Sequence, residues 1–294
     1  MLDPHQLAAL AAIQRRGSFE LAAAELNVSP SAISQRLKVL EERVGTLLVR
    51  RGQPCQATKA GLRLIRHHDE LVLLEQALAA DLPTVSAGPA LLRIAVNADS
   101  LATWVIPALA RVDDFLYDIV IADQDISQDL LRRGEVSAAI TSHPGPLQGC
   151  DTLPLGQLRY LATASPAFMA RWFADGVTPA ALSRAPALIF SQDDRLQDIW
   201  VNRATGGQVS AGGFPAHRLA SSHGFVAACK AGLGWGLNPE PLVAPALRTG
   251  EICTLLPDAP LDVALYWQFA RLTAPSTAGL TAAILAAARG CLLP

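Results

Sequence analysis

A chain of 294 residues exceeds what one hydrophobic core usually organises, so we expect two or three folding units. Apolar residues make up 51% and charged residues 17%, which excludes a disordered chain and predicts sizeable buried cores. The net charge of -2 conceals an asymmetry, because residues 1–66 carry a charge of +5 and the rest carry -7. We therefore expect a polyanion to bind the N-terminal end.

The start of the chain, Met1-Leu2-Asp3-Pro4-His5, lacks the basic lead and apolar run of a secretion signal. No uninterrupted apolar stretch is long enough to span a bilayer, so we expect a cytoplasmic protein without membrane contact. The five cysteines are scattered and include no C-x-x-C pair, which predicts reduced packing residues. We expect no metal site and no cofactor.

Residues 3–44 predict three helices in quick succession, and the last two have the spacing of a helix-turn-helix. Ser29 is predicted to cap the third helix, Pro30 to be its first residue and Gly45 to end it. The apolar residues of this helix recur on one face, which predicts that four of them turn inward: Ile33, Leu37, Leu40 and Val44.

The opposite face of this helix is polar, and a short basic hairpin follows it. Candidate DNA-binding residues on the helix are Pro30, Ser31, Ser34, Gln35 and Lys38. Such side chains at the start of a helix in the major groove read base edges, while Arg50 and Arg51 on the hairpin, or wing, would neutralise phosphates. The alternative is a helical subdomain whose polar face is only solvated, and the coincidence of cap, inward register and basic wing argues against it.

A long helix is predicted from Thr58 to about Asp81, with leucines at seven-residue spacing that need a partner. After a linker rich in small residues, short apolar runs alternate with helical stretches, which is typical of an α/β domain. A second half begins near Val177, so we expect two lobes with a cleft between them.

Three runs of sequence resemble LysR-type transcriptional regulators: residues 22–41 (AAAELNVSPSAISQRLKVLE), 48–51 (LVRR) and 58–61 (TKAG). The resemblance covers the whole chain in length and domain order. It implies dimerisation through the long helix, assembly commonly to tetramers, a double-stranded DNA operator, and a periplasmic-binding-protein-like domain for a small-molecule effector. RNA polymerase is a candidate partner.

The predicted fold class is therefore α+β and multidomain, with an N-terminal winged helix-turn-helix, a long linker helix and a C-terminal two-lobed α/β effector domain. We expect the DNA-binding domain at 1–58, the linker helix at 59–82, a linker at 83–90 and the effector domain at 91–294. Lobe I is expected at about 91–162 and 268–294, and lobe II at about 163–267.

Two further runs, residues 95–104 (AVNADSLATW) and 131–136 (LRRGEV), resemble the ArgP/LysG branch of the family. This resemblance implies an effector that is a basic amino acid, lysine or arginine, and control of genes such as an amino acid exporter. His223 stands where an acidic residue can occur in that branch, and a histidine suits a cationic ligand less well. A different metabolite is therefore the alternative effector.

A basic amino acid needs an anion seat for its carboxylate and acidic groups for its cationic end. The helix start at Asp99 and Ser100 is a candidate seat, because backbone N–H groups are unpaired there. Further candidates for the effector site are Trp104, Asp123, Asp125, Asp193 and His223. Each has an alternative reading, because a carboxylate at a helix start is usually a cap and a lone tryptophan such as Trp104 is usually a core residue.

Known catalytic signatures are missing, including G-x-S-x-G, H-E-x-x-H and the phosphate loop G-x-x-x-x-G-K-S/T. This argues against the second hypothesis, a small-molecule enzyme with a DNA tether. A third hypothesis, an architectural DNA-binding protein, leaves the large α/β remainder unexplained. The sequence thus favours an effector-responsive regulator that is not an enzyme.

Overall fold

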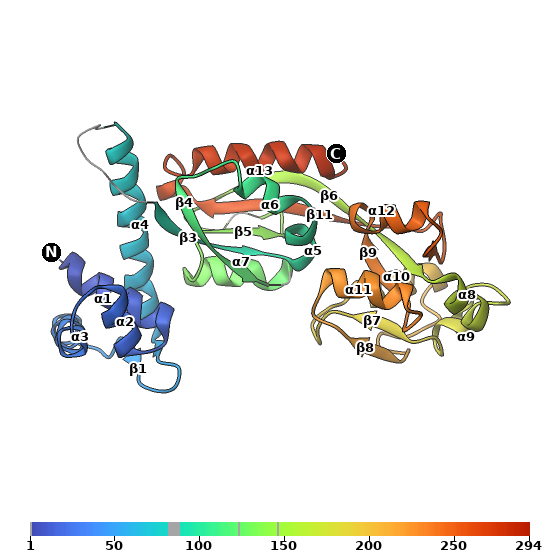
Figure 1. Ribbon diagram of the computed structural model, residues 1–294, viewed down its shortest axis with the longest axis horizontal. Coiled ribbons are helices and arrows are strands. Elements are labelled where there is room, and N and C mark those ends of the chain that lie inside the picture. Colours follow the sequence, from blue (N-terminus) through green and yellow to red (C-terminus); the bar gives the residue numbers. More distant parts are fainter. Residues whose placement is uncertain (1, 82–88, 123, 146) are drawn as a thin grey trace.

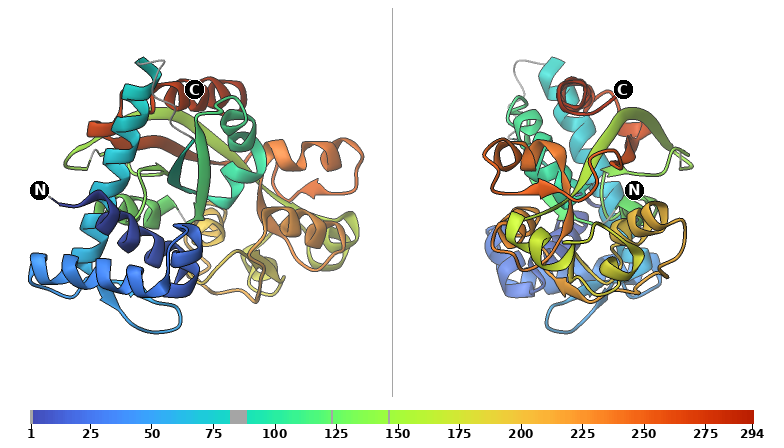
Figure 2. Two further views of the ribbon diagram at one scale, coloured as in Figure 1. Left: turned by 60° about the vertical axis from the view of Figure 1, so that its left-hand side comes forward. Right: turned by 90° about the vertical axis from the view of Figure 1, so that its right-hand side faces the viewer.

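The computed structural model describes residues 2–81, 89–122, 124–145 and 147–294. A bundle of three short helices lies beside one long helix, and a larger α/β region follows it (Figure 1). Two further views show the bundle packed along the first half of the long helix (Figure 2). Within the described ranges, no helix is both long enough and apolar enough to cross a membrane.

The N-terminal bundle consists of three helices, α1 (Pro4–Arg16), α2 (Phe19–Glu25) and α3 (Pro30–Val44). Each begins at a residue whose side chain accepts hydrogen bonds from the first turn: Asp3, Ser18 and Ser29. The core between the helices is apolar, and its fully buried members include Leu10, Ile13, Ile33 and Leu40. The three predicted helices are confirmed.

The wing consists of two short antiparallel strands, β1 (Val49–Arg50) and β2 (Gln56–Ala57). The Glu41 carboxylate of α3 accepts a hydrogen bond from the N–H of Leu48 at 2.7 Å. The Gln14 side chain of α1 accepts one from the N–H of Ala57 at 2.6 Å. Half-buried polar side chains of the bundle thus hold the two strands of the wing in place.

The linker helix α4 (Lys59–Asp81) joins the bundle to the rest of the chain. Leu64 and Leu71 pack against the bundle, whereas Leu73 is only 1% exposed and belongs to the core of the following region. Two leucines of the predicted stripe remain on the surface, Leu74 and Leu78. A single chain therefore leaves part of this apolar stripe uncovered.

A seven-stranded sheet organises the α/β region. Its strands are β3 (Ala90–Val96), β4 (Phe115–Ile121), β5 (Ala138–Thr141), β6 (Cys150–Ala164), β9 (Gly236–Pro239), β10 (Cys253–Thr254) and β11 (Leu261–Ala270). The order is β10-β6-β11-β5-β3-β4, and β9 also pairs with β6. β3 runs parallel to β4 and β5, whereas β11 runs antiparallel to β5 and β6.

Helices cover both faces of the first lobe, which we define as β3, β4, β5 and the helices against them (Figure 1). They are α5 (Ala98–Ser100), the π-helical turn η1 (Leu101–Val105), α6 (Ile106–Leu109), α7 (Gln124–Arg133) and α13 (Ala278–Cys291). Ile94 of β3 lies in the core with α6 and α13, whereas its neighbour Ala95 packs with Leu131 of α7. Burial on both faces explains why this strand is an almost continuous apolar run.

The second lobe contains β9, β10 and the elements α8 (Pro166–Trp172), α9 (Pro179–Leu182), β7 (Ala187–Ile189), α10 (Leu196–Thr205), β8 (Ala216–Arg218), α11 (Ser222–Lys230) and α12 (Glu240–Arg248). The long strands β6 and β11 run through both lobes and pair along their length, with a bulge between Leu265 and Tyr266. Gly156 lies at this bulge with φ +118°, and a Cβ there would meet the carbonyl oxygen of Leu293 at 2.3 Å. Only glycine fits this close backbone approach.

Candidate functional site

Helix α3 presents a polar face to solvent beside a buried apolar face. Ser31, Gln35 and Lys38 are exposed, and Ser34 is half-buried. Three of the four residues predicted to turn inward are buried: Ile33, Leu37 and Leu40. The prediction that Val44 turns inward is wrong. Val44 is the last residue of the helix before Gly45, and it is 38% exposed.

The turn before α3 has the local geometry that the sequence predicts. The Ser29 Oγ accepts a hydrogen bond from the N–H of Ala32 at 3.2 Å, and Pro30 is the first helical residue. Gly45 ends the helix at φ 75°, and its N–H donates to the carbonyl of Glu41. Local sequence therefore determines where α3 begins, at Ser29 and Pro30, and where it ends, at Gly45.

The cations around this face are available for a polyanion. Lys38 lies 3.8 Å from Glu42, but both side chains are largely exposed, so this ion pair is weak. The Arg51 guanidinium stacks over the Phe19 ring at 5.3 Å, which orients it on the wing, and Arg50 is exposed beside it. The arrangement can offer donors to base edges from α3 and positive charge to phosphates from the wing.

A cavity of about 340 Å³ lies between the two lobes, within the usual size range of small-molecule sites. The first lobe contributes Asn97 and Asp99, at the junction of β3 and α5. The second lobe and the long strand β11 contribute Asp193, Gln197, Ser222, Asn238 and Asp262. The site is therefore built from segments far apart in the sequence.

Buried polar atoms without partners line this cavity. Among the described residues there is no hydrogen-bond partner for either amide atom of Asn97, the Gln197 Oε1, the Ser222 Oγ or the Asn238 Oδ1, and these four residues are at most 6% exposed. An unsatisfied buried polar group costs about 1–3 kcal/mol. Four such residues around one cavity leave hydrogen-bonding capacity there for a polar ligand.

Carboxylates give the cavity its negative charge. The Asp99 Oδ2 accepts a hydrogen bond from the buried Tyr160 hydroxyl at 2.8 Å, which holds this side chain in place. Asp193 is exposed, and no cation among the described residues lies within ion-pair distance of it. These two carboxylates are suited to a cationic group of a ligand.

Two other acidic residues at the cavity are occupied by the protein itself. Arg159 binds Asp262 through two parallel hydrogen bonds of 2.8 and 2.9 Å, and these bonds lower the pKa of Asp262. Asp194 accepts hydrogen bonds from the N–H groups of Phe190 and Leu196, which close the turn before α10. Both therefore shape the cavity wall.

The start of α11 faces the same cavity. Ser221 caps this helix by accepting a hydrogen bond from the N–H of Gly224 at 3.0 Å, and the next residue, Ser222, lines the cavity. The free N–H groups of a first helical turn and the positive end of the helix dipole favour a carboxylate. The cavity thus combines an anion seat with acidic groups.

The structure brings together two of the predicted effector residues, Asp99 and Asp193, at the cavity. Asp123 lies outside the described residues, as does the side chain of Asp125 in α7. The predicted contacts of these two with a ligand remain predictions.

Three predicted effector residues do not line the cavity, which corrects their placement. Trp104 is 3% exposed and packs in the apolar core, and Ser100, the last residue of α5, is fully buried and does not line the cavity. His223 is exposed on α11, because successive helix residues diverge, so that Ser222 faces the cavity instead.

Sequence reasoning missed the unpaired polar residues of the cavity: Asn97, Gln197, Ser222 and Asn238. Asn97 had a detectable signal, since it follows a buried strand directly and begins a helix. Gln197, Ser222 and Asn238 show no local sequence pattern, because their burial without hydrogen-bond partners arises only in the tertiary structure.

Residues 4–62 match the family described as bacterial regulatory helix-turn-helix protein, lysR family, and residues 89–289 match the LysR substrate binding domain. The chain belongs to the LysR family of bacterial transcriptional regulators. The predicted fold class, with a winged helix-turn-helix followed by this effector domain, is confirmed.

Relatives of this LysR-type regulator match it along nearly its whole length. The HTH-type transcriptional regulator LysG of Mycobacterium tuberculosis is 45% identical over 290 residues, covering 98% of this chain and 94% of the relative. The crystal structure of ArgP from Mycobacterium tuberculosis has a TM-score of 0.83 at 44% identity, covering 100% and 99% of the two chains. These relatives are named as regulators, and the chain is a DNA-binding transcriptional regulator of the ArgP/LysG type.

A third similar protein has a ligand in its description. The full-length LysG from Corynebacterium glutamicum, described with bound effector Arg, has a TM-score of 0.71 at 39% identity. The match covers 99% of this chain and 100% of that one.

Proposed function

We propose that this LysR-type regulator binds arginine or lysine in the cavity between its lobes, and that the bound amino acid changes how it holds its operator. The observation that carries the proposal is the set of buried polar atoms that have no hydrogen-bond partner among the described residues and that lie in one small cavity with the carboxylates of Asp99 and Asp193. The arginine described in the Corynebacterium glutamicum relative supports the same ligand class.

In this proposal the two ends of the amino acid have separate partners. Its carboxylate takes hydrogen bonds from Ser222 and the first N–H groups of α11. Its guanidinium or ammonium group is held by Asp99 and Asp193. Asn97 orients the bound amino acid through both of its side-chain amide atoms, which have no partner among the described residues. Because the contacts come from both lobes, the ligand favours a closed cleft.

The DNA-binding surface of the proposal is the polar face of α3 with the wing. Gln35 and the serines contact base edges, and the cations contact phosphates. The residues are those predicted from sequence: Pro30, Ser31, Ser34, Gln35, Lys38, Arg50 and Arg51.

Two copies of the chain are proposed to pair through the uncovered leucines of α4, and dimers to pair into tetramers. A two-fold protein matches a pseudo-palindromic operator. Ligand closure then alters the spacing of the DNA-binding bundles, and contact with RNA polymerase is a candidate next step. A regulator of this kind acts where the chromosome lies, in the cytoplasm.

A thermal-shift screen of the amino acids against the full chain tests the ligand class, because selective binding raises apparent stability. We expect arginine or lysine to raise the melting temperature, Asp193→Asn to weaken this effect, and the exposed control Asp175→Asn to leave it unchanged. A response to another metabolite, with none to basic amino acids, would contradict the proposal. Operator footprints with and without the amino acid then test the change on DNA.

A further inference from the structure

A second cavity, of about 1300 Å³, lies between the linker helix and the first lobe and shares no lining residue with the interlobe cavity. We call it the linker groove. One wall is formed by the wing and the first half of α4, with the cations Arg50, Lys59, Arg63 and Arg66. The other wall is formed by the end of α7 and the short 3-10 helix η2 (Arg271–Thr273), with Arg132, Arg133 and Arg271.

Positive charge dominates this groove. Seven Lys and Arg residues line it against two carboxylates, Glu70 and Glu135. Four arginines each pair with one carboxylate, as in Arg66–Glu70, Arg132–Asp129, Arg133–Glu135 and Arg271–Asp151. Within the described part of the chain, the other three cations have no carboxylate within ion-pair distance: Arg50, Lys59 and Arg63.

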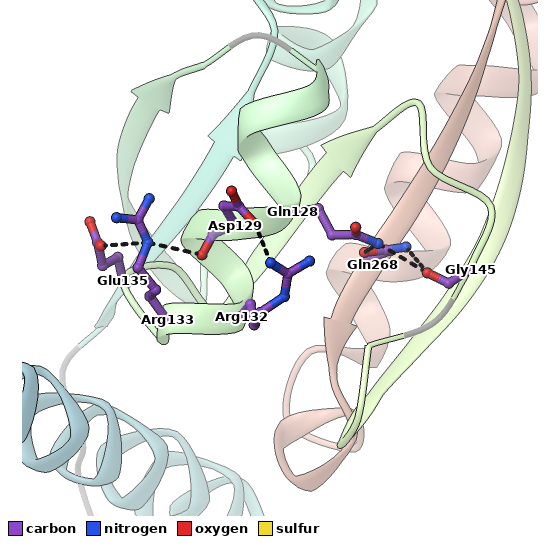
Figure 3. A network of polar contacts seen from close by, with 7 residues as sticks. All are labelled: Gln128, Asp129, Arg132, Arg133, Glu135, Gly145 and Gln268. Carbon is purple, nitrogen blue, oxygen red and sulfur yellow. Dashed lines mark hydrogen bonds and ion pairs between the residues drawn. The ribbon is translucent and has the colours of Figure 1, made fainter.

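The paired arginines also keep donors free. The Arg133 Nε lies near the carbonyl of Asp129 and the carboxylate of Glu135, and Arg132 turns back to the Asp129 side chain (Figure 3). Each guanidinium has five N–H donors, and these contacts use only some of them. Guanidinium groups from the α7 wall can therefore still bind an anion in the groove.

The two walls of the groove meet at one point. Gly134, at the end of α7 with φ +72°, is so close to α4 that a Cβ there would lie 2.5 Å from the Arg66 side chain. Like charges on opposite walls repel each other, and a multivalent anion between them would replace this repulsion by attraction. Arginine forks match phosphate groups, and Leu62, Leu272 and Pro275 add apolar surface to the lining.

We propose that the linker groove binds a compact anion with two or more phosphate groups, which bridges the linker helix to the first lobe. Because α4 carries the helix bundle, such an anion fixes the bundle relative to the effector domain. The groove is thus a second input to the DNA-binding domain, separate from the amino acid. An anion held between two walls of one chain explains the cations of α7 and η2, which a DNA duplex bound to α3 does not.

Isothermal titration calorimetry of the full chain with inorganic pyrophosphate and with ATP, at constant ionic strength and with sulfate as a reference, tests the groove. We expect saturable binding of pyrophosphate or ATP and no heat from sulfate. One variant per wall is needed, Arg63→Gln and Arg132→Gln, and Arg248→Gln is the matched exposed control on α12. Each wall variant should weaken binding about tenfold, as expected for one lost charge-assisted hydrogen bond, and the control should not.

The arms separate the sources of the anion. Pyrophosphate binding assigns the site to the phosphates alone, whereas binding of ATP without pyrophosphate assigns a role to the nucleoside. Absence of saturable binding of both, or weakening by only one wall variant, overturns the bridge. A loss of operator affinity by Arg132→Gln in anion-free buffer would assign the groove to DNA and overturn the proposal as well. We expect the amino-acid thermal shift to persist in both variants, so failure of the groove proposal would leave the proposed function untouched.

Discussion

The helix bundle and the interlobe cavity place their polar side chains in opposite ways. On α3, polar residues lie on the surface and the buried face is wholly apolar. In the cavity, several buried polar atoms have no partner among the described residues, which leaves them able to bind a polar ligand. The exposed polar face of α3 is thus suited to a large polyanion, and the polar interlobe cavity is suited to a small molecule. The two regions should therefore respond independently to mutation.

The largest expected effect separates their stabilities. Leu40 is fully buried in the bundle, and Leu40→Ala should destabilise the N-terminal domain by about 2–5 kcal/mol through lost burial and a cavity. Operator binding should fall with it. Thermal unfolding of the full chain and operator titration measure both changes.

The neighbour Val39 on the same helix is 41% exposed, which makes Val39→Ala a matched control with a small expected effect. In the Leu40→Ala variant, arginine should still raise the melting temperature of the effector domain. If arginine binding is lost together with the folded bundle, the two regions form one cooperative unit and do not respond independently to mutation.

The next effect belongs to the cavity. Asp99→Asn keeps an oxygen for the Tyr160 hydroxyl but removes the charge, so we expect arginine to bind about ten- to hundredfold more weakly, from a loss of about 1.5–3 kcal/mol. Calorimetry with arginine and with its neutral analogue citrulline checks the cause. Equal losses for both ligands would contradict a charge contact at Asp99.

Sequence patterns found most of the fold, because periodicity and caps are local. The three helices of the bundle lie within residues 3–44, as predicted, and β5 is one of the short apolar runs of the α/β domain. Strand β6 extends over 150–164, which is much longer than the short apolar runs on which the prediction of the α/β domain rests. Its half-exposed residues are extended because β11 pairs with them, and sequence periodicity does not record that partner.

The candidate site was less predictable than the fold. Asp99 was found because a helix start after a strand is a local signal, and Trp104 was misplaced because its helix turns it into the core. Ser222 and Asn238 come together only when α11 packs against β9, so no window of sequence reveals their unsatisfied polar atoms. The domain boundaries proposed from the sequence remain predictions.

A smaller effect tests how α3 reads DNA. Gln35 is exposed on the polar face, so Gln35→Ala should relax sequence preference by about 1–3 kcal/mol at one base pair. Arg51→Ala should instead weaken all sequences and reduce the salt dependence by about one phosphate contact. Operator titrations at several salt concentrations distinguish them, and unchanged affinity in both variants would place the recognition surface elsewhere.

The smallest effect concerns the linker helix α4 between the two regions. It carries two groups whose pKa values are shifted in opposite directions. Burial raises the pKa of Asp69 from 3.8 to about 6, opposed by the nearby charges of Arg15 and Arg93. Burial, with the charges of Arg15 and His67, lowers the pKa of His68 from 6.5 to about 4.

The two shifts act against each other. Between pH 3.8 and about 6, the folded chain binds more protons at Asp69 than the unfolded chain does, so the free energy of unfolding falls as pH rises. Between about pH 4 and 6.5, the unfolded chain binds more protons at His68, so the same free energy rises with pH. Their sum leaves only a shallow slope from these two groups.

Single variants should expose the two slopes. Relative to the unmodified chain, the stability of Asp69→Asn should rise more steeply with pH over this window, and that of His68→Gln should fall. Each difference is expected to be on the order of 1–2 kcal/mol, discounted for partial solvent access. Urea unfolding at several pH values measures them, and subtracting the unmodified chain removes the other carboxylates. Parallel slopes in all three proteins would mean that this part of α4 opens before the bundle or the effector domain unfolds, so that neither group is buried in the transition observed.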